Sequence, residues 1–90
     1  VVSGDRNSLD VTFHSYSTLV GEIHESLKSE QIDEKKKNEA LEILSDIDDS
    51  IKQKKKPSFI KSALTGLKDF LIAAGASITA SIISSKIIGI

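Results

Sequence analysis

The sequence predicts a mainly α-helical fold: an antiparallel helical hairpin, a long C-terminal helix packed against it, and a short extended arm at the N-terminus. Two observations support this. Apolar residues recur every three or four positions through the middle of the chain, which places them along one face of a helix. In the last third the spacing becomes heptad-like, as in helices that pack side by side. The elements would form a three-helix bundle within one chain or a helical oligomer of several chains.

Length and composition restrict the function further. With 90 residues and 9.7 kDa, the chain can form one small domain with a modest core. It has no Cys, so disulfides cannot reinforce that core, and a zinc site would need His and carboxylate ligands alone. Twelve basic residues against 13 acidic ones give a net charge of −1, so we expect no nucleic-acid partner. Because the sequence begins without an initiator Met, we expect it to be a fragment of a larger protein, either an excised segment or a processed product.

Charge divides the chain into parts. Residues 1–56 carry nine basic and 12 acidic side chains, whereas residues 57–90 carry three basic side chains and one acidic. The change falls at the start of the C-terminal helix. We therefore expect an extended, β-like arm over 1–14, a charged helical hairpin over 15–56 and an apolar, small-residue-rich helix over 57–90.

The arm is predicted from a period of two. Leu9, Val11 and Phe13 alternate with polar residues, which is typical of a half-buried strand. An isolated strand or hairpin is marginally stable in water, so the arm would need a neighbour.

The hairpin is predicted from two helical stripes, over residues 15–30 and 33–55. Their apolar members are Tyr16, Val20, Ile23 and Leu27, and then Ala40, Ile43 or Leu44, Ile47 and Ile51. Asp33 suits the N-cap of the second helix, and Pro57 disfavours helical geometry in the residue before it. Gly21 costs about 1 kcal/mol relative to Ala, which close approach of another helix would compensate.

The C-terminal helix is predicted over residues 58–88, with small residues at every fourth position beside its apolar seam. Small residues at this spacing let two helix backbones approach closely. The side chains expected at this helix–helix interface are Leu64, Leu67, Leu71, Ala76, Ile78, Ala80 and Ile82.

Catalytic and metal-binding constellations are not evident in the sequence. His14 and His24 lack convergent partners, so we interpret both as structural or surface residues. The acidic run Asp46–Asp49 lacks the Gly and the distal Glu of a calcium loop, and on a helix it faces lysines three or four positions away. We expect no enzymatic activity, no cofactor, no metal and no small-molecule substrate.

Lysines precede the apolar segment and suggest a second type of contact. Residues able to meet an anionic surface are Lys52, Lys54, Lys55, Lys56, Lys61 and Lys68. Next to an apolar helix such a run resembles a polybasic flank that contacts anionic headgroups; the alternative is solubilising charge at a helix end. Residues 70–90 are long enough to cross a bilayer core, but their serines gather on one side, which favours burial in a protein interface.

These patterns predict a non-catalytic helical interaction module, coiled-coil-like, that mediates self-association or docking within a larger protein. Its partners would be further copies of the chain or partner helices, and its location cytoplasmic. The alternative is a membrane-associated or membrane-inserting helix over 70–90 with a polybasic flank.

Overall fold

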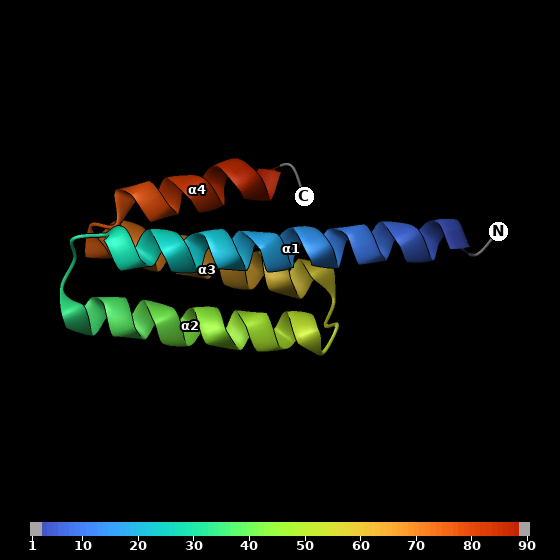
Figure 1. The fold of residues 1–90 in the computed structure, drawn as a ribbon, viewed down its shortest axis with the longest axis horizontal. Helices are drawn as coiled ribbons and strands as arrows, with labels where there is room; N and C mark the ends of the chain where they lie inside the picture. Colours follow the sequence, from blue (N-terminus) through green and yellow to red (C-terminus); the bar gives the residue numbers. More distant parts are fainter. Residues whose placement is uncertain (1–2, 89–90) are drawn as a thin grey trace.

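Four α-helices form an antiparallel bundle in the computed structural model, which describes the backbone of residues 3–88 and the side chains of residues 11–88 (Figure 1). The helices are α1 (Ser3–Ser29), α2 (Glu34–Lys52), α3 (Pro57–Ala74) and α4 (Ser77–Ile88). Successive helices run in opposite directions. Both α1 and α3 contact α2 and α4, whereas α2 and α4 do not touch one another within the described residues. The prediction of a mainly helical fold is confirmed, but the bundle has four helices rather than three.

The predicted extended arm is wrong over its described part, because residues 3–14 belong to α1. The helical stripe continues upstream of Tyr16 to Phe13, which is buried, and this longer pattern prevails over a three-residue alternation. In a helix Val11 turns away from that stripe, and its side chain is 64% exposed. Since a helix rises about 1.5 Å per residue, α1 is longer than its neighbours, and its N-terminal part projects past the bundle (Figure 1).

The single C-terminal helix predicted over 58–88 is also wrong, because the chain reverses at Gly75. This residue has φ 87°, the left-handed conformation that glycine adopts without steric cost. The N–H of Ala76 donates to the carbonyl of Leu71 at 2.8 Å, and the N–H of Gly75 donates to that of Ile72 at 3.2 Å. This pair of bonds is a Schellman motif, which ends α3 and lets α4 fold back beside it.

Helix α2 also ends in a Schellman motif. Its last residue is Lys52, whereas Pro57 alone would have allowed the helix to continue to Lys56. Lys54 has φ 56°, and its N–H donates to the carbonyl of Ile51 at 3.0 Å, while Lys55 N–H donates to Ser50 at 3.1 Å. A lysine in the left-handed region carries a steric cost that glycine would not. At the other end of α2, Asp33 stands at the N-cap as predicted, although its side chain makes no capping hydrogen bond.

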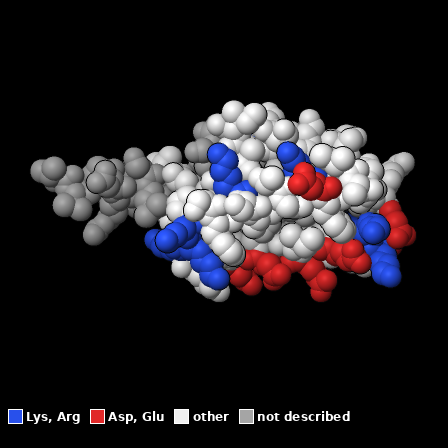
Figure 2. All heavy atoms as spheres, turned by 180° about the vertical axis from the view of Figure 1, so that it is seen from behind, with Lys and Arg blue, Asp and Glu red and all other residues white. Residues whose placement is uncertain are grey.

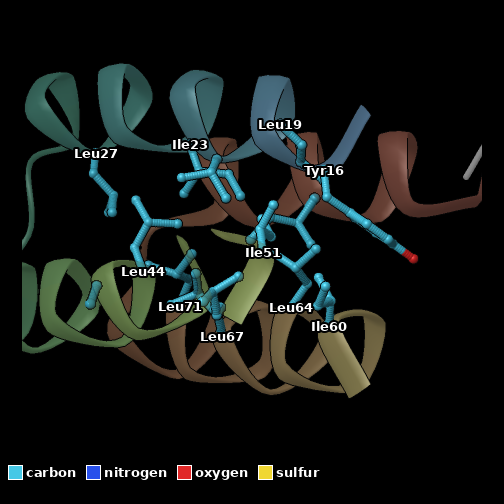
Figure 3. Packing of buried hydrophobic residues seen from close by; sticks show 14 of the residues in the cluster. Tyr16, Leu19, Ile23, Leu27, Leu44, Ile51, Ile60, Leu64, Leu67 and Leu71 are labelled. Atoms are coloured by element: carbon cyan, nitrogen blue, oxygen red, sulfur yellow. The ribbon is translucent and has the colours of Figure 1, made fainter. Parts of the chain in front are cut away.

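The core lies between the four helices and is built from the predicted stripes. Figure 3 shows Leu and Ile side chains of α1, α2 and α3 converging on the bundle axis. The buried members of the two hairpin stripes are Tyr16, Val20, Ile23, Leu27, Ala40, Leu44, Ile47 and Ile51. Each fully buried Leu or Ile contributes about 1.5–3 kcal/mol relative to exposure, so this core is the main stabilising element. The close approach expected at Gly21 is absent, because a Cβ there would meet no atom within 4 Å.

Candidate functional site

The histidines and the acidic run do not form a metal-binding cluster, although His24 of α1 and Asp48 of α2 line the same open groove between these helices. His14 and His24 are exposed on α1. Within the described residues, no group of three or more His, Cys, Asp or Glu side chains is arranged to hold a metal ion. On α2, Asp48 Oδ2 lies 3.0 Å from Lys52 Nζ, and the hydrogen bond and charge of that carboxylate raise the pKa of the ammonium. The predicted pairing of this acidic run with a lysine four positions away is therefore present.

The predicted interface residues fall into two groups. Leu64, Leu67 and Leu71 of α3 are fully buried in the intramolecular core. The remaining four lie in or just before α4, and their environments differ: Ala76 and Ala80 are buried, Ile82 is partly buried, and Ile78 is 67% exposed. Ala76 and Ala80 thus lie where α4 packs onto the rest of the bundle, consistent with close approach at small residues.

A polar contact that no sequence pattern indicated joins the end of α1 to the start of α4. Glu30 Oε1 accepts hydrogen bonds from the backbone N–H of Thr79 at 2.8 Å and from its hydroxyl at 3.0 Å. The hydroxyl oxygen of Ser26 lies 2.7 Å from that of Thr79. Because Thr79 is in the first turn of α4, the Glu30 carboxylate satisfies an otherwise unpaired N–H at the positive end of the helix. This contact ties the start of α4 to the end of α1.

Two exposed surfaces could contact a partner, and the first is the outer face of α4, which carries serines and isoleucines but almost no charge. It consists of Ser77, Ile78, Ser81, Ser85 and Ile88, all exposed. A groove of about 570 Å³ runs between this face and α1, and Lys86 Nζ lies 4.0 Å from Glu22 Oε2 across it. Lys86 is the single charged residue in α4. The face is therefore polar through hydroxyls but nearly uncharged.

The second exposed surface lies where α2 passes into α3. We call it the lysine patch, and it consists of the exposed residues Lys52, Lys54, Lys55, Lys56 and Lys61. Lys68, two turns further along α3, is partly buried. Phe59 emerges beside the patch with 51% of its surface exposed, and Lys55 Nζ lies 5.2 Å from the centre of its ring. The patch thus combines several ammonium groups with one exposed aromatic ring.

On the face shown in Figure 2, basic side chains cluster at both ends of the bundle with others between them on the upper part, and acidic side chains form a row along the lower edge. Carboxylates of α2 that are exposed include Glu42, Asp46 and Asp49. Acidic charge is thus concentrated along α2 on this side of the bundle and meets basic charge at the end of the helix, where Asp48 pairs with Lys52.

Within residues 3–88, no helix combines the length and the apolar character needed to cross a bilayer. Comparisons of the chain with known protein families, with curated proteins and with solved structures found no match. The functional argument therefore rests on the two exposed surfaces.

Proposed function

We propose that the chain is a non-catalytic helical interaction module that self-associates through the outer face of α4. The observation that carries the proposal is the composition of this face. Ile78 is 67% exposed and Ile88 81% exposed, while hydroxyl side chains fill the positions between them. The cores of protein interfaces are depleted in charged residues, and this face differs in that respect from the exposed side of α2, which is strongly charged.

The size of the exposed side chains supports the same proposal. Ser77, Ser81 and Ser85 are four residues apart and therefore form a low ridge along the exposed side of α4. A helix of a second copy can approach such a ridge closely, with Ile78 packing beside it. In a two-fold symmetric pair the same face would serve both partners.

Sedimentation equilibrium of the purified chain tests the proposal directly. We expect the chain to form a dimer or a larger assembly at tens of micromolar. Ser81→Lys places a charge in the centre of the face, where two copies would bring like charges together, so we expect this variant to sediment as a monomer. Ser45→Lys makes the same change on the exposed surface of α2 and should leave the assembly intact.

Two results would contradict self-association through this face. The first is a wild-type chain that stays strictly monomeric throughout this concentration range. The second is an assembly that Ser81→Lys and Ser45→Lys affect equally, because the association would then depend on another surface.

A further inference from the structure

We infer that the lysine patch and Phe59 form a binding site for the surface of an anionic lipid bilayer, separate from the self-association face of α4. The sequence between Ser50 and Lys68 contains six lysines and no acidic residue. The fold concentrates five of these lysines at one end of the bundle, because the short connection between α2 and α3 brings the two helix ends together.

The backbone of the connection determines how the ammonium groups are presented. The left-handed residue Lys54 turns the chain sharply out of α2, so Lys54, Lys55 and Lys56 follow one another in exposed positions. Neighbouring ammonium groups such as those of Lys55 and Lys56 repel one another, and a surface bearing many negative charges relieves that repulsion. Lys52 Nζ lies 3.0 Å from Asp48 Oδ2, which already offsets part of its charge.

Phe59 is the second and independent observation. Its ring is 51% exposed in the first turn of α3, although the next residue, Ile60, is fully buried, and it borders a shallow groove between α3 and α2 that Ile43 and Asp46 also line. Lys55 Nζ lies 5.2 Å from the ring centre, so the ring and an ammonium group occupy the same small area. An aromatic ring among lysines is suited to a bilayer interface, where the ring enters the boundary between headgroups and acyl chains and the ammonium groups remain with the headgroups.

The chemistry of the patch favours a lipid surface over a nucleic acid. Nucleic-acid sites use arginine for bidentate contacts and several aromatic rings for stacking, whereas this patch has lysines alone and one ring. The projecting part of α1 passes the same end of the bundle, so a flat bilayer would approach from the side of α3 (Figure 1).

Vesicle co-sedimentation with the full 90-residue chain tests this site. The probes are vesicles of phosphatidylcholine alone and vesicles that also contain phosphatidylserine. We expect binding only to the second kind at an ionic strength of about 0.1 M, and loss of binding at about 1 M, where the Debye length falls to about 3 Å. The double variant Lys55→Ser with Lys56→Ser should bind about 25-fold more weakly, since each lysine near an anionic surface contributes about fivefold.

Two further variants complete the experiment. Phe59→Ser should weaken vesicle binding without changing its dependence on salt, because it removes an apolar rather than a charged contact. Lys35→Ser with Lys37→Ser removes the same charge from the start of α2 and should bind like the wild type. Circular dichroism of each variant shows whether the bundle is retained.

The inference would be overturned by equal binding to both kinds of vesicle, by no binding at low salt, or by equal losses in the two lysine double variants. Tighter binding to double-stranded DNA than to the phosphatidylserine vesicles would assign the patch to nucleic acid instead. None of these outcomes bears on self-association, because Ser81 and the lysine patch lie on different elements.

Discussion

Ala80→Leu tests whether α4 depends on close packing against the rest of the bundle. Ala80 is 4% exposed and belongs to the buried cluster, so a leucine there adds three carbon atoms where the side chain has almost no access to solvent. Overpacking of this kind costs about 1–3 kcal/mol, because neighbouring side chains leave their rotamers or the backbone shifts. Helix propensity contributes little to the change, since leucine forms helices nearly as well as alanine.

The expected loss is large enough to measure by thermal unfolding. In a domain of this size 1 kcal/mol shifts Tm by about 4–8 °C, so Ala80→Leu should lower Tm by about 4–24 °C. Ala73→Leu is the matched control, because Ala73 is exposed near the end of α3 and the same substitution there should change stability by no more than about 0.5 kcal/mol. An Ala80→Leu chain that melts at the same temperature as the Ala73→Leu chain would refute the packing argument.

Further predictions concern single positions. Gly66→Ala should raise the free energy of unfolding by about 0.5–1 kcal/mol, because Gly66 is exposed within α3 and a Cβ there meets nothing within 4 Å; urea titration would contradict this if the variant were less stable. Lys54→Gly should exceed Lys54→Ala in stability by about 1 kcal/mol, since both remove the side chain and only glycine relieves the left-handed backbone; equal urea midpoints would count against strain at this turn. Thr79→Val should cost about 1 kcal/mol in the same assay, because it removes a buried hydroxyl with two hydrogen-bond partners, and an unchanged midpoint would show that this contact does not stabilise α4. Burial raises the pKa of Tyr16 above its usual 10.0, so the folded state favours the protonated phenol, and stability should fall as pH rises above about 10. Tyr16→Phe should remove that part of the pH dependence, and an identical slope in both chains would assign it to other groups.

The sequence was most informative where one periodic pattern covered a whole helix. The stripes of α1 and α2 are buried almost residue for residue, because a run of apolar side chains at helical spacing has one way to leave water. It was misleading where two patterns competed. Leu9, Val11 and Phe13 fit a strand over five residues, but Phe13 also extends a stripe that runs to Leu27.

The break at Gly75 was missed for a related reason. The apolar seam continues on both sides of this residue, so periodicity alone does not reveal the reversal. The local signals of a helix end and a new helix start were Gly75 itself and Ser77 two positions later. The contact between Glu30 and Thr79 had no such signal, because nothing local marks a bond between residues 49 positions apart. The residues of the lysine patch, in contrast, lie close together in the sequence. A run of lysines is normally exposed to solvent, so this surface could be predicted. Sequence alone did not show that Phe59 would emerge beside it.

The order in which neighbouring helices contact one another has a consequence for how fast the chain folds. Three of the four lateral pairings in the bundle join helices that follow one another along the chain, so each can form by closing a short loop. Small helical domains with such local contacts fold within microseconds to milliseconds. The remaining pairing, between α1 and α4, closes over the 49 positions from Glu30 to Thr79 and carries the largest loop-closure entropy. We therefore expect the amides of α4 to exchange with solvent through partial opening, while those of α1, α2 and α3 exchange only when the whole bundle unfolds.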